Sequence, residues 1–130
     1  GLYRQMKKAV SDKYLLRLWH DALILTKGSS CLECGRPAAG FHHIYHRWHM
    51  VTRYLEDNGI PLCVGHHSRA DRDQYFALSF LEPDDKEHLM RLGRVDLKTF
   101  LWDAGLTENE WLQKCLVDLK EVIAISKRKF

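Results

Sequence analysis

The sequence lacks the features that define several large protein classes. It contains no apolar run of membrane-spanning length, and its first residues lack the apolar segment of a signal peptide. Proline is scarce, with 3 residues in 130, and no stretch rich in proline, glycine or serine divides the chain. The formal net charge of +3 is too small to indicate a nucleic-acid partner by itself. These absences favour a single domain with no membrane contact.

Cysteine is also scarce, but three of the four cysteines lie at spacings typical of metal ligands. Cys31 and Cys34 form a Cys-x-x-Cys pair, and Cys63 is followed by His66 and His67. Two disulfides would suit a secreted protein, whereas these spacings favour a metal in a reducing compartment. Because Zn²⁺ prefers four nitrogen or sulfur ligands, we predict a structural zinc held by the three cysteines and His66. His67 is the alternative fourth ligand.

A second group of polar residues is not needed by that zinc. His42 and His43 lie on an expected strand, and the helix expected after Cys63 places His67 and Asp71 on one face. A His and an Asp on that face, opposite the two strand histidines, predict a half-open site for a divalent cation with room for a phosphate. Adjacent residues on a regular strand face opposite sides. His42 and His43 can therefore share one centre only if the strand is twisted there.

The hydrophobic period predicts mostly helices around one hairpin. Thr107 and Glu110 form a capping box at the start of the final helix. Cys115 lies in the apolar stripe of that helix and is expected to be a buried small hydrophobe. The expected strands are 41–45 and 59–63, the insert 46–56 is expected to be partly helical, and the expected helices are 3–26, 64–78, 82–92, 96–103 and 108–126.

The combined motifs resemble a known family. The Cys-x-x-Cys pair, the Phe-His-His-Ile step at 41–44, Asn58 and the Pro-Leu-Cys-x-x-His-His run at 61–67 resemble the HNH (His-Me finger, ββα-metal) endonucleases. They are most similar to the subset in which a structural zinc pins the hairpin, and to phage nucleases that enhance recombination. The resemblance covers residues 31–73, about a third of the chain. The expected helices on either side of these residues resemble no family that we recognise.

The resemblance implies a role for each matching residue. His43 would be the general base that activates a water, and Asn58 would orient the hairpin loop and hold the His43 imidazole. His42, His67 and Asp71 would bind a catalytic cation, Mg²⁺ or another divalent ion, which would stabilise the developing charge. The implied function is a metal-dependent endonuclease or nickase that hydrolyses DNA in phage or bacterial recombination or repair. Such an enzyme would act in the cytoplasm, with a recombinase as a possible partner.

The expected architecture is one domain, residues 1–130, of the α+β class and mostly α. Residues 31–75 would form a zinc-pinned ββα-metal core. Residues 1–28 and 79–130 would form a helical scaffold on either side of it.

Contacts with DNA are expected from three arginines, Arg47 in the insert and Arg69 and Arg72 on the helix after Cys63. A second interpretation needs only the Cys/His cluster: a non-catalytic, zinc-stabilised nucleic-acid-binding or protein-interaction module. The additional histidines and Asn58 separate the two interpretations, because zinc binding alone does not require them.

Overall fold

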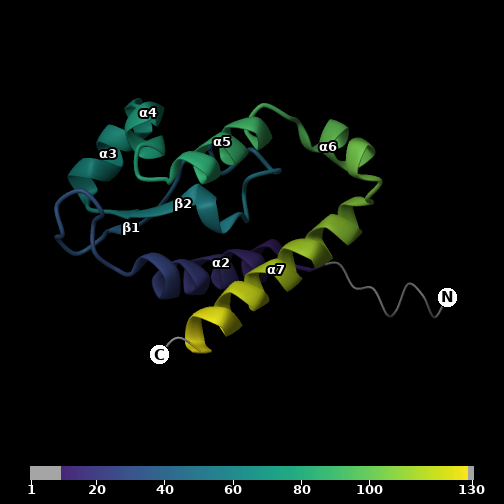
Figure 1. Ribbon diagram of the computed structural model, residues 1–130, viewed down its shortest axis with the longest axis horizontal. Coiled ribbons are helices and arrows are strands. Elements are labelled where there is room, and N and C mark those ends of the chain that lie inside the picture. Colours follow the sequence, from purple (N-terminus) through teal and green to yellow (C-terminus); the bar gives the residue numbers. More distant parts are fainter. Residues whose placement is uncertain (1–9, 129–130) are drawn as a thin grey trace.

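The computed structural model describes residues 10–128, which are mostly helical with one small antiparallel sheet (Figure 1). This confirms the predicted α+β class with helices predominating. None of the described helices is long and apolar enough to cross a membrane. The elements in chain order are α2 (Asp12–Lys27), β1 (Gly40–His43), the 3-10 helix η1 (Glu56–Asn58), β2 (Gly59–Leu62), α3 (Val64–Arg72), α4 (Gln74–Leu78), α5 (Pro83–Leu92), α6 (Leu97–Ala104) and α7 (Glu108–Arg128).

Helix α2 begins at Asp12 because Ser11 caps it, with the Ser11 Oγ accepting a hydrogen bond from the Tyr14 N–H at 3.1 Å. The sequence predicted a helix from residue 3. Residues 3–9 lie outside the described part of the chain, and Val10 and Ser11 are not helical. The prediction is therefore wrong for residues 10 and 11. The Ser11 side chain caps the N-terminus of the helix, so the helix begins at the next residue.

Strands β1 and β2 form the predicted hairpin, each slightly shorter than expected, with His43 opposite Gly59. Strand β2 packs directly on α2. A Cβ at Gly59 would lie 2.3 Å from Leu23 Cδ1 and 2.5 Å from Trp19 Cζ2, so only glycine fits at this close approach. The sheet and α2 are thereby held in contact at the end of the hairpin that carries His43.

The long connection between the strands departs from the prediction. Residues 46–55 form a series of turns rather than an α-helix, and η1 begins at Glu56. Asn58 is fully buried: its Oδ1 accepts from the Tyr45 N–H at 2.7 Å, and its Nδ2 donates to the carbonyls of Tyr45 and Thr52. These side-chain bonds satisfy loop groups that a helix would have satisfied within its own backbone.

The helix predicted over residues 64–78 is divided at Asp73 into α3 and α4. Asp73 has an extended backbone, and its Oδ1 accepts a hydrogen bond from the Phe76 N–H at 3.2 Å. An aspartate that caps the next turn competes with helix continuation, which explains the break. Helix α3 keeps the segment that carries the candidate ligands.

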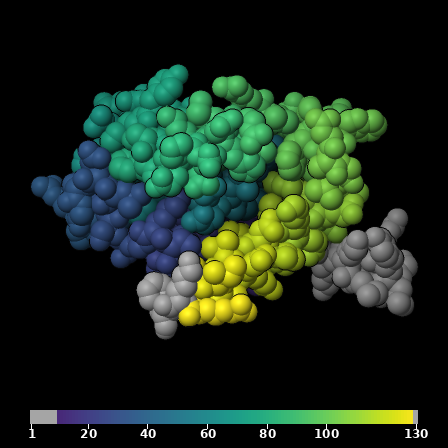
Figure 2. Space-filling view, in the orientation of Figure 1, coloured from purple at the N-terminus to yellow at the C-terminus, as the bar shows by residue number. Residues whose placement is uncertain are grey.

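Two apolar clusters support these elements. The space-filling view places the yellow C-terminal helix α7 along the purple helix α2, with the teal and green segments on the opposite half of the molecule (Figure 2). The predicted capping box starts α7, with reciprocal Thr107–Glu110 hydrogen bonds of 3.1 Å, and Cys115 is buried as predicted. The α2–α7 cluster comprises Leu15, Trp19, Ala22, Leu23, Tyr54, Trp111, Cys115 and Leu119. The hairpin cluster comprises Cys31, Ile44, Ile60, Leu62, Ala70, Phe76, Ala77, Leu78 and Leu89.

Candidate functional site

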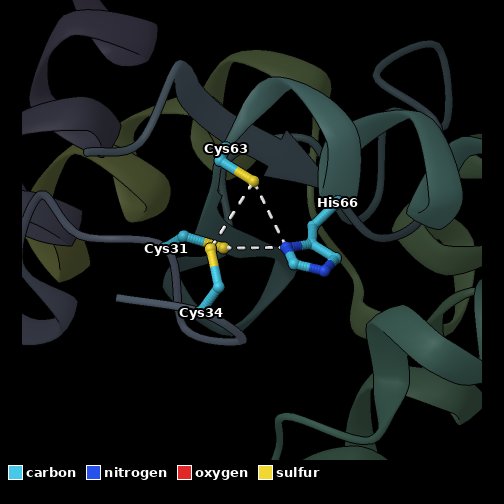
Figure 3. Close-up of side chains that lie close together, drawn as sticks. All are labelled: Cys31, Cys34, Cys63 and His66. Carbon is cyan, nitrogen blue, oxygen red and sulfur yellow. Dashed lines mark hydrogen bonds between the residues drawn. The ribbon is translucent and has the colours of Figure 1, made fainter. Parts of the chain in front are cut away.

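Three cysteines and one histidine converge where the hairpin meets α3 (Figure 3). Cys31 and Cys34 lie in the turn before β1, Cys63 lies between β2 and α3, and His66 lies in the first turn of α3. The Cys63 Sγ is 3.2 Å from His66 Nδ1 and 3.8 Å from Cys34 Sγ, and the Cys31 Sγ is 3.5 Å from His66 Nδ1. We call these four residues the sulfur cluster.

The sulfur cluster has the dimensions of a tetrahedral metal site. Zinc–ligand distances of about 2.3 Å to sulfur and about 2.0 Å to nitrogen imply separations of about 3.8 Å between sulfurs and about 3.5 Å between sulfur and nitrogen. The 3.8 Å and 3.5 Å separations in the cluster match these values, and the Cys63 Sγ–His66 Nδ1 separation of 3.2 Å is slightly shorter. It could therefore bind a metal such as zinc. Of the two histidines that the sequence left open, His66 joins the cysteines and His67 does not.

The protonation of Cys31 also suits a metal ligand. Burial raises the pKa of its thiol, but backbone N–H groups of Cys63, Cys34 and Glu33 point at the sulfur and together lower that pKa to about 6. Hydrogen bonds to the charged form favour the thiolate. The thiolate is the form that binds metals, so the fold prepares this ligand at neutral pH.

A second group of three ligands, His42, His67 and Asp71, lies beside the sulfur cluster and is called here the open cluster. His42 Nδ1 is 3.4 Å from Asp71 Oδ1, and His67 Nδ1 is 3.3 Å from Asp71 Oδ2. His42 is 6% exposed, while the Asp71 side chain is 57% exposed. Burial, together with the nearby His67, lowers the pKa of His42 to about 4, which leaves a neutral imidazole able to bind a cation.

His43 lies on the other side of β1 from His42, as strand geometry requires. Its ring stacks on Trp19 of α2, with centroids 4.1 Å apart and planes 12° from parallel. Its Nε2 is 3.1 Å from the Arg53 carbonyl oxygen. Because a carbonyl oxygen can only accept, Nε2 carries the proton in this contact, and Nδ1 keeps its lone pair in the neutral ring.

The charge state of His43 follows from its surroundings. Burial lowers the pKa of His43 to about 4, and the positive charges of Arg53 and Arg47 act in the same direction. The hydrogen bond to the Arg53 carbonyl opposes this shift. The imidazole is therefore neutral at pH 7 and can accept a proton on Nδ1.

An open cleft of about 410 Å³ brings His43 and the open cluster together. The lining includes both strand histidines, although they face different helices. Arg47 and Gln74 also line it, and the Gln74 Nε2 donates to the Ile44 carbonyl at 3.1 Å. The same cleft is thus lined by three potential cation ligands and by a neutral imidazole, and its volume is large enough for a phosphate group and a water.

Among residues 10–128, the hydrogen bonds of the Asn58 side chain go to loop backbone groups and not to the His43 ring. In the described part of the chain, its side chain bonds to the backbone of Tyr45 and Thr52, and its carbonyl accepts from the Ile44 N–H at 2.9 Å. Asn58 thus holds the loop together, but the direct bond to the His43 ring comes from the Arg53 carbonyl. The expectation that Asn58 holds the imidazole itself is corrected accordingly.

The three candidate arginines occupy different positions. Arg47 lines the cleft, with its guanidinium carbon 5.3 Å from the centre of the exposed Trp48 ring. Arg69 packs 3.9 Å above the Phe76 ring and does not line the cleft. Arg72 is exposed on α3 and is likewise outside the lining. The structure therefore brings Arg47 closest to the candidate site.

Three residues of the site were not predicted from the sequence: Trp19, Arg53 and Gln74. Trp19 reads as one apolar position in the stripe of α2, and Arg53 and Gln74 belong to no recognisable motif. Their contacts with β1 or the following loop depend on the packing of α2 and α4 against the hairpin. No local spacing in the sequence indicates these contacts.

Comparisons with known proteins add no assignment. No family model matches the chain, and searches of curated proteins and of solved structures found no match.

Proposed function

We propose that the protein is a metal-dependent endonuclease or nickase with an HNH-type ββα-metal core that hydrolyses phosphodiester bonds in DNA. One observation carries the proposal: a neutral imidazole whose Nδ1 keeps its lone pair lines the same cleft as three convergent cation ligands. The sulfur cluster fits a structural zinc that joins the turn before β1 to α3. The sequence resemblance over residues 31–73 supports the same assignment.

His43 is the proposed general base. Its Nδ1 takes a proton from a water while the Arg53 carbonyl keeps Nε2 protonated, so the ring becomes an imidazolium that still donates to that carbonyl. The water oxygen then attacks phosphorus, and the bond to the leaving 3′ oxygen breaks. The Trp19 indole lies flat against the ring and limits its movement during this transfer.

The open cluster is the proposed site of the catalytic cation. When bound there, a divalent ion supplies positive charge for the phosphate oxygens and the leaving oxygen. Two imidazoles and one carboxylate suit Mn²⁺ or another transition-series ion better than Mg²⁺, which prefers oxygen ligands. Asp71, more than half exposed, leaves one side of the cluster accessible to substrate.

Arg47 is the proposed phosphate contact because it lines the cleft, whereas Arg69 and Arg72 lie further along α3. A role in phage or bacterial recombination, with a recombinase as partner, follows from the resemblance alone and stays a prediction.

The proposal is tested by a nicking assay on supercoiled plasmid, with Mg²⁺ or Mn²⁺ and a chelator control. His43→Ala is expected to lower the rate about 100-fold or more, because general-base catalysis supplies about 10²–10⁴-fold. Bound zinc and cooperative unfolding should persist. His88→Ala removes an exposed histidine of α5 and should nick like the wild type.

The alternative, a non-catalytic zinc-stabilised binding module, makes a different prediction. It requires zinc in the protein but no metal-dependent cleavage of duplex, single-stranded or branched DNA. Cleavage at the wild-type rate by His43→Ala would instead show that another residue is the base.

A further inference from the structure

Arg53 is a buried cation in the connection between the strands, with only 6% of its surface exposed. Asp12 of α2 binds it through two parallel hydrogen bonds of 2.8 Å, from Nε and from Nη2. Its Nη1 donates to the Arg47 carbonyl at 2.6 Å. A guanidinium held at three nitrogens has one permitted position, so the backbone of Arg53 is held as well.

That backbone contacts the proposed base. The Arg53 carbonyl accepts the hydrogen bond from His43 Nε2, so the ion pair with Asp12 is linked to the imidazole through a single residue. The Tyr54 hydroxyl also donates to Asp12, which adds a second tie between the same loop and α2.

Helix α2 makes one more contact with the base. Trp19 lies against the face of the His43 ring, and its Nε1 donates to the Leu55 carbonyl at 2.7 Å. The indole is therefore hydrogen-bonded to the same loop whose Arg53 carbonyl binds the edge of the His43 ring. Asp12 and Trp19 both lie outside residues 31–73, to which the sequence resemblance is confined.

We propose that α2 is part of the active site: Asp12, acting through Arg53, and Trp19 are positioning residues that hold His43 with its proton on Nε2. The inference rests on the proposed nuclease function. Without this support the neutral ring could carry its proton on either nitrogen, and the tautomer with the proton on Nδ1 cannot accept one there. Residues that orient metal-binding imidazoles through hydrogen bonds typically affect activity about 10- to 100-fold, and we expect an effect of the same size on a proposed base.

The test uses Asp12→Asn in the full chain, with Asp21→Asn as the matched control. Both aspartates lie on α2 with side chains just over half exposed (52% and 53%), but Asp21 pairs only with the exposed His20, at 3.9 Å, among the described residues. Asp12→Asn is expected to lower kcat for plasmid nicking about 10- to 100-fold and to leave KM unchanged. Asp21→Asn should match the wild type. Asp12→Glu, which keeps the carboxylate, should restore part of the rate.

A second measurement determines which ring nitrogen of His43 carries the proton, and it does not depend on activity. Nitrogen-15 NMR of the neutral His43 ring is expected to show protonated Nε2 in the wild type and in Asp21→Asn, but a mixture of tautomers in Asp12→Asn. All variants are measured at a temperature where circular dichroism shows each fully folded, which separates positioning from loss of fold.

The outcomes are distinguishable. Absence of cleavage by the wild type would refute the proposed function, and the tautomer measurement would still decide whether Asp12 positions His43. In a protein that cleaves, an unchanged kcat for Asp12→Asn would overturn the inference and leave the nuclease assignment intact. An unchanged tautomer, or an equal loss of rate in Asp21→Asn, would also overturn it.

Discussion

The sulfur cluster and the open cluster lie side by side on the same hairpin and helix, yet they differ in donor chemistry and in access. The sulfur cluster has three thiols and one imidazole at tetrahedral separations, which leaves no position for a substrate. The open cluster has two imidazoles and a carboxylate, and it borders a cleft of about 410 Å³. Adjacent residues of α3, His66 and His67, divide between them.

If the proposed function holds, one short segment serves stability and chemistry separately. Successive residues on a helix point about 100° apart, so two neighbouring histidines necessarily face different surroundings. His66 lies beside the three cysteine sulfurs, and His67 lines the cleft. We therefore expect substitutions in the sulfur cluster to lower stability, and substitutions in the open cluster to lower the proposed activity without a loss of stability.

The largest effect is expected from Cys63→Ala. It removes the ligand that joins β2 to α3, and structural zinc contributes directly to folding, so we expect a loss of stability of about 5 kcal/mol or more together with loss of bound metal. Thermal unfolding followed by circular dichroism, with metal analysis, measures both. Cys115→Ala is the control: this cysteine is more deeply buried than Cys63 but lies in the α2–α7 cluster, and the variant should keep the metal. Retention of metal by Cys63→Ala would contradict the assignment of the sulfur cluster.

The second effect is expected from Asp71→Asn. If the protein is the proposed nuclease, loss of the only carboxylate of the open cluster should lower the cleavage rate about 100-fold, because an amide is a weaker ligand and supplies no charge. The melting temperature should stay close to that of the wild type, since Asp71 is mostly exposed. Asp118→Asn is a matched control with similar exposure and its own i,i+4 partner. Equal activity of the two variants would remove the functional distinction between the clusters.

The smallest effect concerns pH and a group outside both clusters. Burial, with the nearby Glu56 and Asp85, raises the pKa of Asp57 to about 6, against an opposing effect of Lys27. A carboxyl whose folded pKa is raised stabilises the fold fully below its unfolded pKa of about 4, and this contribution disappears as pH rises through about 6. The full shift corresponds to about 3 kcal/mol, and solvent screening of this half-buried carboxyl reduces it. Asp57→Asn should therefore be more stable than the wild type at pH 8, by about 1 kcal/mol, and show no such gain near pH 4.

Melting temperatures of the two proteins across this range measure that difference. Acid should act in the opposite direction on the sulfur cluster and destabilise it, because metal ligands must be deprotonated to bind. A difference between the two proteins that is independent of pH would show that Asp57 does not titrate as its surroundings imply.

Short-range features of this protein follow from the sequence. Cys31 and Cys34, and likewise Cys63 and His66, are near neighbours in the chain, so their spacing alone brings each pair together. The i,i+4 relation of His67 and Asp71 and the capping box at Thr107 are equally local. The break at Asp73 and the turns of residues 46–55 were not predicted, because side-chain hydrogen bonds to the backbone outweigh the apolar period there.

Only the tertiary structure decided which neighbouring histidine joins which cluster, and what supports His43. Both strand histidines are equivalent in sequence, but α3 packs against one side of β1 and α2 against the other. Asp12 and Arg53 are 41 residues apart, and no pattern in the chain links them. The physical reason is that local spacing determines which residues can share a turn, whereas packing of distant helices on the hairpin determines which buried group each side chain meets.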